Sequence, residues 1–245
     1  MSGPVQKGYV GCSGWSYGDW AGRFYPKDLP TTQWFGYYCR HFDTVELNNT
    51  FYHLPRPTTV ARWSGQAPEG FIYAVKAHRS ITHLKRLKSV DQQVAGFAGA
   101  IAGLGGHLGP VLYQLPPGLH KDIPLLEDFL ATIPERQQAV LEFRHKGWYD
   151  DVVFCLLERH GVGFCVHDMA GSASPRVCTA DLIYIRFHGA TGRYRGCYTD
   201  KVLSDWAEWV VGQDRARCVY AYFNNDIGGH AVTNAMTFKS MLANL

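Results

Sequence analysis

The chain has 245 residues, of which 46% are hydrophobic and 18% are charged, and its formal net charge is +3. This length suits one large globular domain and is short for two, and the small charge neither requires nor excludes an anionic partner. The seven cysteines are dispersed singly, without a Cys-x-x-Cys pair, which favours reduced thiols over disulfides or a zinc site. A leader pattern and an apolar run long enough to span a membrane are both missing, so we expect a cytoplasmic protein without membrane contact.

Strand-like and helical patterns alternate along the chain. The strands are expected at residues 9–13, 44–48, 71–78, 110–115, 139–145, 162–167, 182–188 and 218–224. The helices are expected at residues 32–41, 58–66, 90–104, 123–132, 151–160, 200–211 and 230–245, whereas residues 169–181 are too irregular to predict as a helix. Strands that alternate with helices indicate βαβ units and a parallel sheet. Eight such units predict an α/β protein with a single (β/α)8 TIM-like barrel domain over residues 1–245.

An open doubly wound sheet is the rival fold, but no Gly-x-Gly-x-x-Gly motif follows the first expected strand. The lengths of the connections also favour a barrel. Long segments follow four of the strands, at residues 15–31, 49–57, 79–89 and 189–199, whereas the connections at 41–44 and 160–162 from helix to strand are short. Long loops after strands are typical of the catalytic face of a barrel.

Polar and apolar residues alternate at the ends of several strands. The apolar rows are Val45 and Leu47, Val75 and Ala77, Leu141 and Phe143, and Ile185 and Phe187. Successive side chains of a strand point to opposite faces, and the face toward the helices must be apolar. The polar partners are therefore expected at the C-terminal mouth of the barrel, and they are Glu46, Asn48, Lys76, His78, Glu142, Arg144, Arg186 and His188. The same alternation adds Ser13, Gln114, His167 and Asn224.

The expected ring has mixed charge. Its cations are Lys76, Arg144 and Arg186, and its carboxylates are Glu46, Glu142 and Asp168. Burying single charges is costly, so these groups should pair or hold a ligand. Nearby cations lower carboxylate pKa values, which suits Glu46 or Glu142 to serve as general base, electrostatic stabiliser or metal ligand. The proton donor is then expected among Lys76, His167 and His188.

We assign two sets of site residues from these patterns. The catalytic set is Glu46, Lys76, Glu142 and Asp168. The substrate-binding set is Ser13, Trp15, Asn48, Tyr52, Gln114, Arg144, Trp148, Arg186, His188 and Asn224. No cofactor is predicted and no metal ligand is assigned. A divalent metal stays open because carboxylates and histidines are suitable ligands, although the sequence has no His-Glu-x-x-His motif and the cations would repel the ion.

Aromatic and basic residues are concentrated in the loops of the same face. The aromatic residues, Trp15, Tyr52 and Trp148 among them, would stack on a sugar or a base, or else form local loop cores. The basic segments 76–88 and 192–196 would follow a phosphate backbone or simply be solvated. A small anionic or phosphorylated ligand is the expected partner. Nucleic acid remains an alternative, and protein partners are unknown.

Ordered motifs along the whole chain resemble the YecE-like family that carries "domain of unknown function 72". The motifs are SGWSY at 13–17, FYP at 24–26, TVELNNTFY at 44–52, VKA at 75–77, ITH at 81–83, QLPP at 114–117, EFRH at 142–145, RFHG at 186–189 and FNND at 223–226. This resemblance implies a TIM-like barrel and brings no established reaction. The chain departs from the family pattern at Cys12, where threonine is expected, and at His167, which is less typical.

The main hypothesis is an enzyme that uses acid–base and electrostatic catalysis on a phosphate-bearing or other anionic substrate, as a hydrolase or lyase. One alternative is a metal-assisted phosphodiester hydrolase, by analogy with barrel endonucleases. Another is a non-catalytic protein that binds nucleic acid or an anionic ligand. Glycoside hydrolysis is disfavoured because Glu46 and Glu142 lie on nearly opposite strands. A self-satisfied polar network without catalytic function would also produce this ring of residues.

Overall fold

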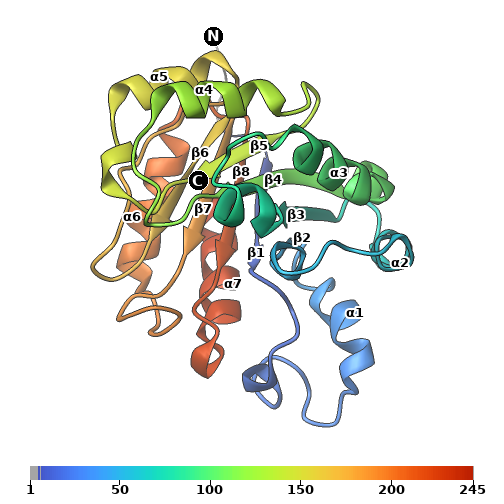
Figure 1. The fold of residues 1–245 in the computed structure, drawn as a ribbon. Helices are drawn as coiled ribbons and strands as arrows, with labels where there is room; N and C mark the ends of the chain where they lie inside the picture. The colour runs from blue at the N-terminus through green and yellow to red at the C-terminus, as the bar shows by residue number, and fades with distance from the viewer. Residues whose placement is uncertain (1–4, 6, 245) are drawn as a thin grey trace.

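Eight parallel strands form a nearly closed barrel that helices surround (Figure 1). The computed structural model describes residue 5 and residues 7–244. Each strand pairs with its neighbours in the order β1-β8-β7-β6-β5-β4-β3-β2. This order and the helices between most successive strands are those of a (β/α)8 barrel, so the predicted fold is confirmed.

The strands are β1 (Lys7–Cys12), β2 (Thr44–Leu47), β3 (Ile72–Lys76), β4 (Leu108–Gln114), β5 (Ala139–Glu142), β6 (Gly163–Asp168), β7 (Leu182–Phe187) and β8 (Cys218–Phe223). The helices are α1 (Trp34–Tyr38), α2 (Pro57–Gln66), α3 (Asp91–Ile101), α4 (Ile123–Thr132), α5 (Asp151–Arg159), α6 (Asp200–Val211) and α7 (His230–Ala243). Side chains cap three of the helices, since Asp122, Asp150 and Thr199 accept hydrogen bonds from the first turns of α4, α5 and α6.

All eight expected strands and seven expected helices have a counterpart, with differences at their ends. The expected strand at 139–145 stops at Glu142, which leaves Arg144 in the following loop. The expected helix at 90–104 divides into α3 and the 3₁₀ segment Ala102–His107, and the positive φ of Gly105 interrupts that 3₁₀ segment. Residues 169–181 form no helix, as expected. Residue 245, at the end of the last expected helix, lies outside the described residues.

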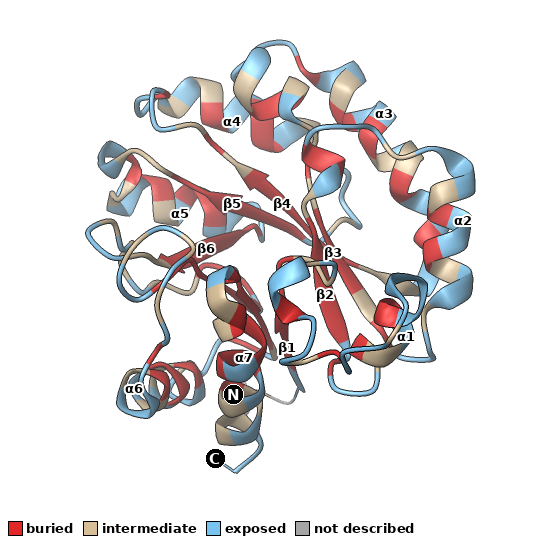
Figure 2. Ribbon diagram, turned by 90° about the horizontal axis from the view of Figure 1, so that it is seen from below, coloured by how far each residue is buried: buried red, intermediate tan, exposed pale blue. Residues whose placement is uncertain are grey.

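Two separate groups of buried side chains fill the layers of the barrel. All four apolar rows of the sequence prediction belong to the outer core, between strands and helices. A smaller inner cluster fills the barrel with alternate residues such as Ala74, Leu112, Val140, Tyr184 and Tyr222. Figure 2 shows the same layering, with buried residues throughout the strands and exposed residues on the outer helix surfaces. The predicted alternation is therefore confirmed, and it directs the polar residues of the strand ends inward.

A tyrosine side chain closes the barrel between β1 and β2. The hydroxyl of Tyr38, on α1, accepts a hydrogen bond from the Cys12 backbone N–H at 2.8 Å and donates one to the Thr44 carbonyl at 2.9 Å. A Cβ atom at Gly11 would lie 2.3 Å from that carbonyl oxygen, so only glycine permits this close approach. The seam thus depends on a side chain in place of a backbone ladder. Among the described residues, no helix is long and apolar enough to cross a membrane.

Candidate functional site

A cavity of about 830 Å³ opens at the C-terminal ends of the strands. A volume of this size is typical of small-molecule sites. The strand ends contribute Asn48, Lys76, Gln114, Arg144, Arg186, His188 and Asn224 to its lining. The loops contribute others, among them Tyr17, Phe51, Tyr52, His83, Arg193, Tyr194 and Asp226. The cavity therefore lies where the sequence predicted that polar groups converge.

Glu46 lies buried at the floor of this site, in the middle of β2. Its Oε1 accepts hydrogen bonds from Ser13 Oγ at 2.7 Å, from Arg186 Nη2 at 2.7 Å and from Asn48 Nδ2 at 3.1 Å. Its Oε2 accepts one from Tyr184 at 2.8 Å. Burial opposes ionisation, but the Arg186 charge and these donors outweigh it and lower the pKa of Glu46. The carboxylate is thus ionised and fully occupied.

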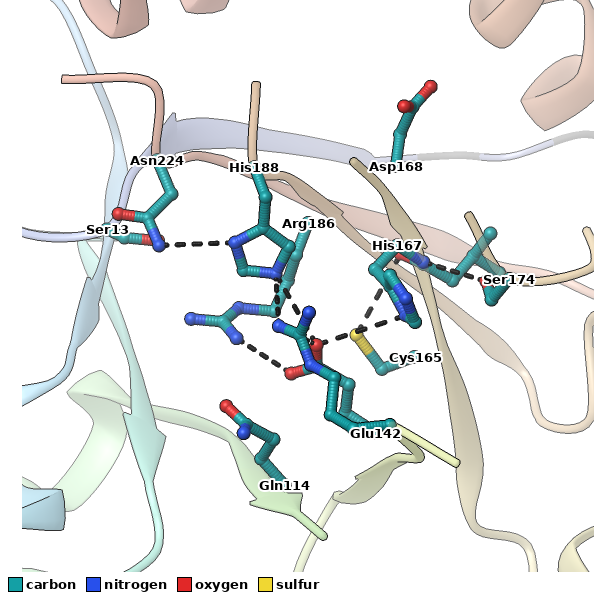
Figure 3. A network of polar contacts seen from close by, with 12 residues as sticks. Ser13, Gln114, Glu142, Cys165, His167, Asp168, Ser174, Arg186, His188 and Asn224 are labelled. Carbon is teal, nitrogen blue, oxygen red and sulfur yellow. Dashed lines mark hydrogen bonds and ion pairs between the residues drawn. The ribbon is translucent and has the colours of Figure 1, made fainter. Parts of the chain in front are cut away.

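Glu142 and two arginines complete a buried ionic network (Figure 3). Arg186 Nη1 donates to Glu142 Oε2 at 2.7 Å, so this one guanidinium joins both glutamates. Arg144 Nη2 pairs with Glu142 Oε1, and His188 Nε2 lies 3.4 Å from the same oxygen. Burial again opposes ionisation, but the Arg144 and Arg186 charges hold the pKa of Glu142 well below its ordinary value. Such mutual pairing is what makes buried charges tolerable.

The imidazole of His188 is neutral within this network. Its Nε2 lies 2.6 Å from Arg144 Nη2, and a guanidinium nitrogen can only donate, so Nε2 must be the acceptor. The other ring nitrogen, Nδ1, lies 3.3 Å from Asn224 Nδ2. Burial and the Arg186 charge lower the pKa of His188 to about 3, and burial lowers that of His167 as well. Neither histidine is a ready proton donor near neutral pH.

Lys76 has a different environment from the two glutamates. Its Nζ donates to the neutral Gln114 Oε1 at 2.7 Å and lies 4.3 Å from the centre of the Phe51 ring. Among the described residues, no carboxylate lies within salt-bridge distance of this amine. Burial and the Arg186 charge lower the pKa of Lys76 to about 8. Its amine therefore exchanges protons close to neutral pH.

The structure brings most of the predicted site residues together. Glu46 and Glu142 form the floor, and the predicted residues that line the cavity are Asn48, Tyr52, Lys76, Gln114, Arg144, Arg186, His188 and Asn224. Ser13 is buried beneath them and bonds to Glu46, so it orients that carboxylate. Tyr52 is 56% exposed at the rim.

Three predicted site residues lie elsewhere. Asp168 points away from the network (Figure 3), and its carboxylate accepts a hydrogen bond from Trp206 Nε1 at 3.2 Å. His167 points inward on the same strand, so strand alternation itself turns Asp168 outward. Trp148 is fully buried, stacks on Phe143 and donates to the Leu119 carbonyl at 2.7 Å. Trp15 packs against Phe35, outside the cavity lining. The assignment of a catalytic role to Asp168 and of substrate binding to both tryptophans does not fit these positions.

His78 was also expected at the mouth of the barrel, but its side chain does not point into the cavity. Its Nδ1 lies 2.8 Å from Ser80 Oγ, within the turn after β3, and it is not part of the cavity lining. The strand ends at Lys76, so alternation no longer determines the direction of a side chain two residues later. His83, from the short π-helix that follows, lines the cavity in its place.

Asp226 is the most informative lining residue that the sequence prediction missed. Its side chain is 8% exposed, and its Oδ1 is buried without a hydrogen-bond partner among the described residues. Burial raises the pKa of Asp226 to about 8, and the nearby Asp19 and Glu46 contribute to the rise. The site therefore contains a carboxylic acid that remains protonated at neutral pH. Its position in the FNND motif, two residues after the predicted Asn224, was the available sequence signal.

Neither of the two buried glutamates is free to coordinate a divalent metal ion. In the part of the chain that the structure describes, no group of three or more His, Cys, Asp or Glu side chains is placed to hold one. Glu46 and Glu142 are bonded to guanidinium groups, which would have to move before either carboxylate could coordinate a cation.

One protein-family model matches almost the whole chain. The family model described as "Protein of unknown function DUF72" matches residues 9–245. The chain belongs to the DUF72 family. The predicted resemblance to YecE-like proteins is thereby confirmed.

Relatives of this DUF72 protein carry no established activity in their names. The UPF0759 protein YecE of Escherichia coli is 31% identical over 142 residues, which cover 58% of this chain and 50% of YecE. The match thus spans half the length of that relative. The UPF0759 protein YunF of Bacillus subtilis is 25% identical over 272 aligned positions, which cover 96% of this chain and 94% of YunF.

Solved structures of DUF72 proteins share the fold. A family member from Thermotoga maritima superposes with a TM-score of 0.87 at 32% identity, and the match covers 97% of this chain and 100% of the other. One from Enterococcus faecalis gives a TM-score of 0.83 at 21% identity, with 97% and 96% covered. These likenesses agree with the TIM-like barrel and name no substrate.

Proposed function

We propose that this DUF72 barrel is an enzyme that acts on a small anionic substrate, such as a phosphorylated metabolite, held in the cavity at the C-terminal mouth. The observation that carries the proposal is the excess of cations there. Lys76, Arg144 and Arg186 face two buried carboxylates, Glu46 and Glu142, which leaves one positive charge uncompensated. An anionic ligand would balance this charge at low energetic cost.

Binding of the anion is assigned to Arg144 and Lys76. Both terminal nitrogens of Arg186 are taken by the glutamates, so this residue orients the network and is a poor ligand for the anion, contrary to the sequence prediction. Arg144 uses Nη2 for Glu142 and His188, and its side chain is 15% exposed. Lys76 has one neutral partner, Gln114, and keeps further N–H groups free for an anion.

Proton transfer is assigned to groups whose pKa lies near neutrality. The sequence suggested Glu46 or Glu142 as the base, but both carboxylates are ionised, buried and bonded to arginines, which makes them weak bases. Lys76 and Asp226, each with a pKa of about 8, line the cavity and are the better candidates. The glutamates then act by holding Arg186 and Arg144 in place.

Calorimetric titration with inorganic phosphate and a panel of small phosphomonoesters tests the proposal. Arg144→Gln should weaken binding by about tenfold or more, because a charge-assisted contact is lost. The matched control is Arg79→Gln. Arg79 is an exposed arginine in the basic segment 76–88, and its side chain does not line the cavity. If wild type and Arg144→Gln bound phosphate and the phosphomonoesters with equal affinity, the anion site could not be this cavity.

The same titrations separate the enzyme from a non-catalytic binding protein. Lys76→Arg keeps the positive charge, so an enzyme variant should bind the anion and lose turnover of any phosphomonoester that wild type converts. A binding protein for nucleic acid would instead require the exposed basic loops, and its affinity would fall steeply with salt. Loss of binding in Arg79→Gln together with unchanged binding in Arg144→Gln would favour that alternative.

A further inference from the structure

Among the described residues, no carboxylate pairs with the amine of the half-buried Lys76, although an enclosed lysine ordinarily needs such a partner. Its pocket consists of the Phe51 ring, the Gln114 amide and the nearby His83, and its Nζ reaches the cavity. A lysine that served only to balance charge would be expected to pair with one of the two floor carboxylates, but Arg186 occupies both. This arrangement therefore needs another explanation.

We propose that Lys76 is a nucleophile that forms an imine with the carbonyl carbon of an anionic substrate. The inference rests on the proposed function, since Arg144 would hold the anionic group while the amine reacts. It narrows the substrate class to small aldehydes or ketones that carry a phosphate or carboxylate.

The chemistry requires no external reagent. The lone pair of the neutral Lys76 amine attacks the carbonyl carbon, a C–N bond forms, and the carbonyl oxygen takes up a proton to give a carbinolamine. Loss of that oxygen as water, together with the remaining proton of the nitrogen, leaves the C=N bond of the imine. Two hydrogens leave the amine and one oxygen leaves the carbonyl as a single water molecule, so no oxidation or reduction occurs.

The surroundings favour the free amine. Burial is the largest influence and the Arg186 and Arg144 charges add to it, whereas Glu142 and Glu46 oppose them, and the resulting pKa is about 8 compared with 10.5 for an ordinary lysine. The fraction of neutral amine near pH 7 is then on the order of a hundredfold larger than at an exposed lysine. Desolvation beside other cations is a known way to activate an amine nucleophile.

His83 lines the same cavity as this amine and lies close enough to be influenced by its charge. Its Nδ1 lies 2.9 Å from Thr82 Oγ1, and its ring contacts the edge of Phe51 at 4.8 Å between centroids. Burial and the Lys76 charge lower the pKa of His83, so the ring is neutral at physiological pH. The neutral ring therefore adds no second positive charge to this part of the cavity wall.

Borohydride trapping with pyridoxal 5′-phosphate, an aldehyde that carries a phosphate, tests the proposal. Reduction fixes any imine as a stable adduct, and peptide mass spectrometry identifies the lysine. We expect Lys76 to be labelled about tenfold or more faster than other lysines near neutral pH, with a pH midpoint near 8. Inorganic phosphate should suppress this labelling, and pyridoxal without its phosphate should label Lys76 much more slowly.

Two variants provide the controls. Lys76→Arg should abolish the fast adduct, whereas Lys121→Arg, which changes an exposed lysine paired with Asp150, should leave it unchanged. If Lys76→Arg fails to fold, the position of the adduct in the wild-type protein still shows whether Lys76 forms the imine. Phosphate binding in the cavity without preferential labelling of Lys76 would overturn the imine and leave the proposed function intact. Absence of both phosphate binding and preferential labelling would overturn both proposals.

Discussion

Arg186 stabilises two buried carboxylates at once, and this dependence determines how the site responds to substitution. Its two terminal nitrogens each lie 2.7 Å from a glutamate oxygen, one of Glu46 and one of Glu142. Arg144 also compensates Glu142, whereas no second cation pairs with Glu46 within the described residues. Loss of Arg186 would therefore affect Glu46 more than Glu142.

Arg186→Met should destabilise the fold by about 3–5 kcal/mol, because it leaves Glu46 buried without its cation. Urea unfolding measures the change. Addition of Glu46→Gln to this variant should restore part of the loss, since the uncompensated charge is then removed. Arg159→Met is the control, because its exposed pair with Glu127 is 3.5 Å long and should contribute less than about 1 kcal/mol. Equal losses in the two arginine variants would contradict a buried ionic network.

Asp226→Asn should change how stability depends on pH. Burial raises the pKa of Asp226 from 3.8 to about 8, so between these values the folded state binds a proton that the unfolded state has released. The contribution of Asp226 to stability therefore falls as pH rises through this range. The variant should match wild type near pH 4 and be more stable, on the order of a few kcal/mol, above pH 8.

Urea unfolding across this pH range tests the Asp226 prediction. Asp214→Asn, at an exposed position, serves as the control and should keep the wild-type slope. A parallel pH dependence in wild type and Asp226→Asn would show that the carboxyl is not held protonated in the folded state.

At the level of elements, the seam between β1 and β2 depends on α1. Tyr38→Phe removes the hydroxyl that bridges the Cys12 N–H and the Thr44 carbonyl, and both of these groups are buried. Leaving buried backbone groups without a partner should destabilise the fold by about 1–3 kcal/mol. Tyr37→Phe changes the neighbouring residue of the same helix, whose hydroxyl makes no hydrogen bond among the described residues, and should change little.

Chemical unfolding of both tyrosine variants, with hydrogen exchange at Cys12 and its neighbours on β1, measures the effect. Faster exchange in Tyr38→Phe alone would locate the loss at the seam. If Tyr37→Phe were equally destabilising, the bridging hydroxyl of Tyr38 would not account for the loss.

For the whole molecule, periodic features were predictable from the sequence and aperiodic ones were not. The succession of strands and helices predicted the barrel, and the alternation within strands predicted its apolar outer rows and the inward direction of Glu46, Glu142 and Arg186. It could not predict that Trp148 would serve as a loop core, because the loops have no repeat that fixes side-chain direction. Asp226 was missed for the same reason, since its burial depends on how the loops after β1 and β8 meet.

The sequence also did not predict which charged residues of the strand ends pair with one another. The sequence showed a near balance of cations and carboxylates in the ring. The structure adds that Arg186 pairs with both glutamates and that Lys76 donates to Gln114. The roles of acid and base follow from this pairing and not from residue type. Lys76 consequently exchanges protons near neutral pH, whereas Glu142 stays ionised and holds Arg144 and Arg186.

The molecule as a whole should be sensitive to acid. His188 has its pKa lowered from 6.5 to about 3, and the pKa values of His83, His167, Glu46 and Glu142 are also lowered. For each group the unfolded state binds the proton first as pH falls, so stability is present above the unfolded pKa and is lost below it. The histidines contribute from pH 6.5 downward, and the glutamates add to the loss from pH 4.5 downward.

His188→Asn should reduce this acid sensitivity, because the variant lacks one group that takes up a proton on unfolding. Between pH 6.5 and pH 3 the slope of unfolding free energy against pH should fall by up to about 1.4 kcal/mol per pH unit, the value for one proton. Urea midpoints at several pH values measure the slope, and His53→Asn, at an exposed position, should leave it unchanged. An unaltered slope in His188→Asn would mean that the ring is already charged in the folded state. The hydrogen bond from Arg144 to its Nε2 would then be untenable, since a charged imidazole has no acceptor to offer.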